Sequence, residues 1–276
     1  RLSVMKVLAA LAILAAGPAL AAEIPPQALD RAATFAGADV VILGELHDNP
    51  THHAHQARAV TALAPKALVF EMLTPEAAAK MPATLPGAVT LGQTLGWQAS
   101  GWPDFAMYYP IFAAAPQARI YGAEVPRTEA RRVMKEGPIA VFGPEAAAYG
   151  LTNPLPPDDQ SAREAEQAKA HCNALPPDLL PAMVDVQRLR DAALARAVVQ
   201  AMADTGGPVA VITGKTLEGI PRPSLLGDNF VNSCKALESA ERMSGYQVNR
   251  AAISINGAHI KGIASRGVIA VGVGGH

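Results

Sequence analysis

The clearest indication of the fold comes from the stretch Val40-Val41-Ile42-Leu43-Gly44-Glu45-Leu46-His47-Asp48-Asn49-Pro50. It begins with a short apolar, largely β-branched run, which is typical of a buried strand. Glu45 and His47 follow this run, and their spacing puts both side chains on one side of an extended chain. Asn49 and Pro50 then predict the start of a helix, with Asn49 as its N-cap. Titratable groups therefore gather at the carboxyl end of a strand, which is where open α/β sheets bind ligands.

A second strand with the same kind of ending follows. Residues 51–63 form an Ala-rich helical pattern, and residues 67–72 are again apolar apart from a carboxylate near their end, Glu71. Strand, helix and strand within about thirty-five residues predict a βαβ unit, whose two strands are parallel and adjacent or nearly adjacent. We therefore expect Glu71 to project at the same edge of the sheet as Glu45 and His47.

The remainder of the chain continues this alternation. Helices are predicted at 26–36, 127–135 and 178–203, a mixed helical and loop segment at 74–115, a loop at 150–159, and strands at 118–123, 208–214, 251–255 and 267–273. The pattern predicts an α/β fold in which helices flank a mainly parallel central sheet, with a helical subdomain or insertion. We expect residues 23–276 to form a single domain.

Composition narrows the classes of function. The chain has 276 residues, which is enough for a sizeable core, and 50% of them are hydrophobic although only 5% are aromatic. This balance indicates Ala-rich helices around a few Val and Ile strands. The formal net charge is −1 and no basic run is visible. The electrostatic footprint of a nucleic-acid-binding protein is therefore missing.

The first residues have the pattern of a targeting segment. Met5 and Lys6 precede the apolar run 7–16, and a helix-breaking Gly-Pro pair and Ala19-Leu20-Ala21 come next. This order is typical of a secretory signal peptide, and the apolar run is too short for a membrane span. We therefore expect residues 1–22 to be removed and the protein to be exported in soluble form to a bacterial periplasm.

An exported location bears on the two cysteines. No cysteine follows the cleavage signal, which argues against a lipid anchor. Disulfides persist in oxidising compartments. Cys172 and Cys234 therefore either pair or remain two buried free thiols, and two cysteines alone do not decide between these outcomes.

A series of short motifs over residues 38–214 adds a further indication. The motifs are 43–50 followed by His52, His53 and Gln56, then 69–72, 96–97, 101–103, 109–111, 121–123, 171–172, 180–181, 183–184 and 187–191. In type and order these residues resemble the ChaN-like haem-binding uptake proteins of the Tiki/TraB superfamily. The resemblance rests on the whole series, since a lone Gly-Glu-x-His would be weak evidence.

The resemblance implies an α/β fold, a site of paired carboxylates and histidines, and haem as the cofactor. It also implies a role in haem or iron uptake, with an outer-membrane or periplasmic uptake component as a partner. A homodimer stays open, because flat porphyrin ligands are often shared between subunits. Elsewhere in the superfamily the same resemblance implies an alternative function, that of a metal-dependent peptidase or esterase-like hydrolase.

The chain departs from the superfamily pattern at the strand that ends with residue 214. A second G-x-x-H is expected there, but the sequence reads Gly214-Lys215-Thr216-Leu217. His259 is a displaced candidate for a metal ligand, and its glycine spacing is wrong. Because the histidine of the expected G-x-x-H motif is missing after Gly214, we favour ligand binding over hydrolysis as the function. A third interpretation is a member whose site is degraded or whose reading frame is altered.

Glu45 and His47 are the leading candidates for the site. A carboxylate buried at a strand end is costly without a partner, which favours a functional pair over a structural ion pair. These residue types suit a divalent metal, with Glu71 as a third ligand, and they suit general acid/base catalysis equally well. For Glu71 the structural alternative is a carboxylate that caps a helix or pairs with Arg127 or Arg190.

Histidines and tyrosines supply further candidates. His52, His53 and His55 lie on the helix after residue 50, and one of them is expected to face the site. The resemblance alone selects His53. Tyr108 and Tyr109 are candidates for haem ligation because tyrosinate binds haem iron, although a Trp/Tyr cluster in an Ala-rich protein is more often part of the core.

Two arginines interrupt an otherwise apolar helical pattern. Arg188 and Arg190 are suited to receive a haem propionate through charge-assisted hydrogen bonds. A structural pair with Asp185 or Asp191 is an equally good interpretation.

Overall fold

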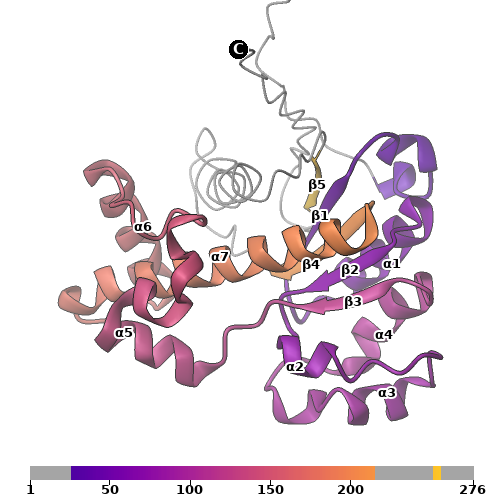
Figure 1. Ribbon diagram of the computed structural model, residues 1–276, viewed down its shortest axis with the longest axis horizontal. Helices are drawn as coiled ribbons and strands as arrows, with labels where there is room; N and C mark the ends of the chain where they lie inside the picture. Colours follow the sequence, from indigo (N-terminus) through magenta and orange to yellow (C-terminus); the bar gives the residue numbers. More distant parts are fainter. Residues whose placement is uncertain (1–25, 215–250, 256–276) are drawn as a thin grey trace, which may run out of the picture.

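The computed structural model describes residues 26–214 and 251–255 (Figure 1). Five parallel strands form one sheet in the order β3-β2-β4-β1-β5. The strands are β1 (Val40–Glu45), β2 (Ala67–Phe70), β3 (Arg119–Gly122), β4 (Val209–Gly214) and β5 (Ala251–Ile255). The predicted α/β fold with a mainly parallel central sheet is confirmed.

Helices cover both faces of this sheet. The α-helices are α1 (Pro50–Leu63), α2 (Pro75–Ala78), α3 (Ala88–Thr94), α4 (Phe105–Ala114), α5 (Arg127–Phe142), α6 (Pro157–Ala170) and α7 (Leu180–Thr205). Short 3-10 helices lie in the connections, at η1 (Pro26–Ala28), η2 (Ala32–Phe35), η3 (Trp97–Ala99), η4 (Pro144–Ala147) and η5 (Pro177–Leu179). Side chains of α1, α3 and α4 pack on one face, and side chains of α7 pack on the other.

The apolar residues of β1 alternate between these two faces. Val41 and Leu43 belong to the core under α1 and α4, whereas Val40 and Ile42 belong to the core under α7. All four side chains are buried, which explains why the strand reads as a continuous apolar run. Glu45 continues the alternation of Val41 and Leu43. Its side chain is therefore directed toward α1 and α4.

β4 lies between β1 and β2, although it comes much later in the sequence. Residues 40–45 of β1 pair with residues 209–214 of β4, and residues 67–70 of β2 pair with residues 209–212 on its other side. β1 and β2 are therefore parallel and nearly adjacent, as predicted. The carboxyl ends of β1, β2 and β4 meet at one edge of the sheet, which we call the carboxyl edge.

α5, α6 and one end of α7 form a helical lobe beside the sheet (Figure 1). The later part of α7, around Val198 and Met202, packs on the sheet. Its earlier part, around Val186 and Leu189, packs with α5 and Tyr149 in a separate apolar cluster. The predicted helical subdomain or insertion is therefore present.

Local predictions are confirmed at α1 and need correction at three other places. Asn49 caps α1 by accepting a hydrogen bond from the Thr51 amide, as predicted. The single helix predicted at 26–36 is wrong, because two short 3-10 helices form instead. The helix predicted at 127–135 continues to residue 142 across a kink at Gly137. The loop predicted at 150–159 is wrong at its end, where Pro157 and two aspartates begin α6, a combination that favours a helix start.

Some predictions fall on residues 1–25, 215–250 and 256–276. The signal peptide, the strand at 267–273, Cys234, His259 and the reading frame after residue 214 lie outside the described residues. Cys172 is exposed, so its interpretation as a buried thiol is wrong. Within the described ranges, none of the helices combines the length and apolarity that a membrane crossing requires.

Candidate functional site

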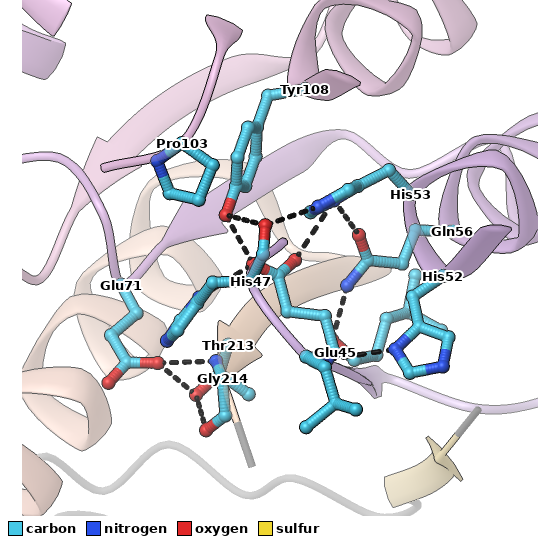
Figure 2. Close-up of polar contacts among 12 residues, drawn as sticks. Glu45, His47, His52, His53, Gln56, Glu71, Pro103, Tyr108, Thr213 and Gly214 are labelled. Carbon is cyan, nitrogen blue, oxygen red and sulfur yellow. Dashed lines mark hydrogen bonds and ion pairs between the residues drawn. The ribbon is translucent and has the colours of Figure 1, made fainter. Parts of the chain in front are cut away.

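Glu45 is the centre of a buried polar network at the end of β1 (Figure 2). Its Oε1 accepts hydrogen bonds from the Tyr108 hydroxyl at 2.5 Å and from His47 Nδ1 at 2.8 Å. Its Oε2 lies 3.3 Å from Nδ1 of His53. A buried carboxylate without partners would be strongly destabilising, so these three groups are what allows Glu45 to occupy the protein interior.

The network sets the protonation states of its members. Burial raises the pKa of Glu45, but the hydrogen bonds from His47, His53 and Tyr108 outweigh burial and bring that pKa down to about 2. Glu45 is therefore ionised near neutral pH. Burial and the Glu45 carboxylate both raise the pKa of Tyr108 far above its ordinary value. The Tyr108 phenol consequently stays protonated and donates its hydrogen to Glu45.

His47 is held on three sides at the carboxyl edge. Its Nδ1 is bonded to Glu45, and its ring lies against Trp102 with the two ring centroids 4.6 Å apart. A Cβ atom at Gly214 would lie 2.2 Å from both Cε1 and Nε2 of His47, so only glycine fits beneath the ring. The His47 side chain is 34% exposed. Since an ionised carboxylate can only accept, Nδ1 is the donor to Glu45, and Nε2 carries the lone pair of the neutral ring. Among residues 26–214 and 251–255, Nε2 has no hydrogen-bond partner.

Two of the histidines of α1 are buried, and they have different roles. His52 accepts a hydrogen bond from the Leu46 amide at Nδ1, which fixes the turn between β1 and α1. His53 donates from Nε2 to the backbone carbonyl of His47 at 2.9 Å, while its Nδ1 faces Glu45 and Gln56. Burial lowers the pKa of His53, but the hydrogen bond and charge of Glu45 outweigh it, and the net pKa is raised. His53 therefore holds His47 in place from within the core.

Glu71 lies at the same edge, as predicted, but it does not join Glu45. Its Oε2 accepts hydrogen bonds from the Thr213 hydroxyl and from the Gly214 amide, each at 2.6 Å. Figure 2 shows Glu71 on the far side of His47 from Tyr108 and His53. Glu71 therefore fastens the end of β4, and its partners are Thr213 and Gly214 rather than the predicted arginines.

Comparison with known proteins identifies the family. A family model described as "Haem-binding uptake, Tiki superfamily, ChaN" matches residues 31–216. The chain belongs to this haem-binding family. The resemblance seen in the sequence is thereby confirmed, over nearly the same residues.

A solved structure shares the fold of this ChaN-family chain. It is described as "Cofacial heme binding to ChaN of Campylobacter jejuni", and the two chains are 17% identical with a TM-score of 0.55. The match covers 85% of this chain and 88% of that chain. At this identity the likeness establishes the fold alone. A search of curated proteins found no match.

The divalent-metal alternative receives no support from the geometry of this ChaN-family chain. Among the described residues, no three His, Cys, Asp or Glu side chains lie together in a way that could hold a metal ion. Glu71 in particular is engaged by the end of β4. The predicted set of Glu45, His47 and Glu71 is therefore not assembled, and His259 lies outside the described residues.

The remaining predicted site residues of this ChaN-family chain form no hydrogen bond or ion pair with the Glu45 network among the described residues. Tyr109 is half-buried, and its hydroxyl donates to the carbonyl of Pro86. Arg188 donates to the carbonyls of Gly150 and Asn153 and pairs with a neighbouring aspartate, so it holds the helical lobe together. Arg190 is exposed and acts electrostatically on Glu124 near the carboxyl edge.

Sequence reasoning missed three members of the site and the role of a fourth. Tyr108 was named as a haem ligand or a core residue, and its role as donor to Glu45 depends on a contact between residues far apart in sequence. Thr213 was not selected, and Trp102 was named only as part of the motif at 101–103. Glu124 follows β3 as Glu71 follows β2, so the same signal of a carboxylate after a strand would have found it.

Proposed function

We propose that this chain binds haem at the carboxyl edge, with His47 as the ligand of the iron. The observation that carries the proposal is the state of His47, whose Nδ1 is fixed by a buried carboxylate while its side chain stays one-third exposed. Histidine is a common haem ligand. Metal-binding histidines usually donate their other ring N–H to a carboxylate or carbonyl, which orients the ring and raises its basicity.

The surrounding residues fit this ligand. Glu45 fixes the tautomer of His47, and His53 fixes its backbone carbonyl. Trp102 offers an aromatic surface beside the ring, which suits a flat, apolar macrocycle. Tyr108 is fully buried and bonded to Glu45, so we assign it to positioning rather than to iron ligation.

Haem binding in this family suggests a role in uptake. We propose that residues 1–22 direct export to the periplasm, and that the mature protein passes haem or iron to an outer-membrane or periplasmic uptake component. Fractionation of cells that produce the full-length chain tests the first step. Recovery of the uncleaved chain in the cytoplasm would contradict it.

Titration of the purified protein with haemin tests the binding proposal. The Soret band is expected to shift up to a defined molar ratio, and His47→Ala is expected to abolish the histidine-type spectrum. His171→Ala is the matched control, because His171 is exposed at the end of α6 and lies outside the network. A featureless titration of the unmodified protein, or one that His47→Ala leaves unchanged, would overturn the proposal.

A further inference from the structure

A second group of charged side chains lies near His47 and is not used by the proposed iron ligation. Glu124 follows β3, and its amide donates to the carbonyl of Leu73 at 2.8 Å, so it is placed beside the segment that follows β2. Burial raises the pKa of Glu124, while Trp102 and the charges of Arg127 and Arg190 act in the opposite direction. These residues therefore share one region of the carboxyl edge.

Arg127 is connected to the proposed haem site through the residues next to Trp102. It is the first residue of α5, and its Nη2 lies 3.3 Å from the place that a Cβ atom on Gly101 would take. Gly101 immediately precedes Trp102, whose ring lies against His47. The guanidinium group thus packs on the backbone next to the aromatic ring that flanks the proposed iron ligand.

The positively and negatively charged side chains of this region differ in their exposure to solvent. Arg127 and Arg190 are exposed, whereas Glu71 and Glu124 are half-buried. Glu71 directs one carboxylate oxygen to the end of β4. In the part of the chain that the structure describes, neither arginine lies within ion-pair distance of a carboxylate. The two guanidinium groups are therefore more accessible to an anion in solution than the two carboxylates are.

We infer that Arg127, assisted by Arg190, binds the carboxylate groups of the haem propionates while His47 binds the iron. The inference rests on the proposed haem binding and adds the chemical class of porphyrin that the edge selects, namely one with ionised carboxylates. A guanidinium group is planar and matches a carboxylate with two parallel hydrogen bonds. Arg188, which is engaged by backbone carbonyls, has no part in this recognition.

Two ligands separate this inference from general haem binding. Haemin carries two free propionates, and haemin dimethyl ester has the same iron and ring without their charges. Unmodified protein is expected to bind haemin more tightly than the ester. Arg127→Ala is expected to weaken haemin binding by about tenfold, the usual effect of one charge-assisted hydrogen bond, and to leave binding of the ester unchanged.

Matched variants define the outcomes. Arg31→Ala removes an exposed arginine in the segment that leads into the amino end of β1, and it is expected to change neither affinity. Arg127→Lys keeps the charge without the planar group, and partial recovery is expected. An equal loss for haemin and ester in Arg127→Ala, or no loss for either, would overturn the inference while haem binding stands. Failure of the unmodified protein to bind haemin would overturn both.

Discussion

Tyr108 combines two roles, because its ring fills a position in the core and its hydroxyl donates a hydrogen bond to the Glu45 carboxylate. The side chain is fully buried between Trp97 and His53, and its bond to Glu45 is only 2.5 Å long. Hydrogen bonds to ionised groups contribute more to stability than neutral ones. We therefore expect the Tyr108 hydroxyl to contribute more to the stability of the fold than a hydroxyl bonded to a neutral group would.

Tyr108→Phe is expected to destabilise the fold by about 1.5–3 kcal/mol, because the ring is kept while Glu45 loses a charge-assisted donor. Tyr109→Phe is the matched control, since that hydroxyl bonds a neutral carbonyl at a half-buried position, and about 1 kcal/mol is expected. Urea unfolding of both variants measures the difference. Equal destabilisation by the two substitutions would contradict the role given to the Glu45 bond.

Glu45 also predicts a dependence of stability on pH. Its pKa falls from an ordinary value of 4.5 to about 2 in the folded protein. A group with a lowered pKa stabilises the fold above its unfolded pKa, and that contribution is lost as the pH falls toward the folded pKa. The free energy of unfolding is therefore expected to decline steeply from about pH 4.5 toward pH 2 in the unmodified protein.

Glu45→Gln is expected to make this decline shallower. Asp30→Asn is the control, because Asp30 also has a pKa lowered by Arg58 but both partners are exposed, where solvent screening weakens the pair. Urea unfolding at a series of pH values compares the slopes. A slope that Glu45→Gln leaves intact would show that other carboxyl groups govern the acid transition.

At the scale of single residues, the sequence permits prediction of close neighbours only. The Glu45 and His47 pair follows from the spacing along one strand, and the structure brings the two side chains within 2.8 Å. The bond from Tyr108 to Glu45 spans 63 positions of the sequence, and the bond from Thr213 to Glu71 spans 142 positions. No local pattern encodes such contacts, because they depend on how separate elements pack.

At the scale of elements, the end of β4 governs the position of His47. Glu71 holds the Thr213 hydroxyl and the Gly214 amide, and Gly214 in turn leaves room for the His47 ring. A side chain at position 214 would displace the imidazole. The geometry of the proposed ligand thus depends on a strand that does not contain it.

Gly214→Ala is expected to weaken haemin binding by about tenfold or more, because the added methyl group overlaps the His47 ring and moves it away from Glu45. Gly87→Ala is the matched control, since no atom lies within 4 Å of its added Cβ. Haemin titration of both variants checks the expectation. Tight binding by Gly214→Ala with an unchanged spectrum would show that His47 does not need this platform.

Elements with strong local signals were predictable, and those decided by distant contacts were not. The apolar run of β1 and the Asn49-Pro50 cap of α1 act within a few residues, and both agree with the structure. The insertion of β4 between β1 and β2 is not visible in either strand's own sequence. At Pro157 the proline and aspartates are compatible with a loop or a helix start, and packing of α6 on α7 decides between them.

At the scale of the whole molecule, the exposed His47 edge bears on assembly. We propose that two copies of this chain share haem at this edge, because a flat ligand bound beside the partly exposed His47 keeps one face open to a second subunit. Light scattering after size-exclusion chromatography is expected to show the molar mass double on addition of haemin. Doubling that persists in His47→Ala would separate assembly from iron ligation.

The place of β4 in the sheet has a consequence for how the chain folds. Until residues 209–214 are available, β1 and β2 have no hydrogen-bonded connection to each other, and their facing edges stay open. Joining them requires closure of a long loop, which slows folding and makes it depend on nearly the whole described chain. Fragments that stop before β4 are consequently expected to expose unpaired strand edges and to aggregate. The central part of the sheet can therefore form only after β4 has been synthesised.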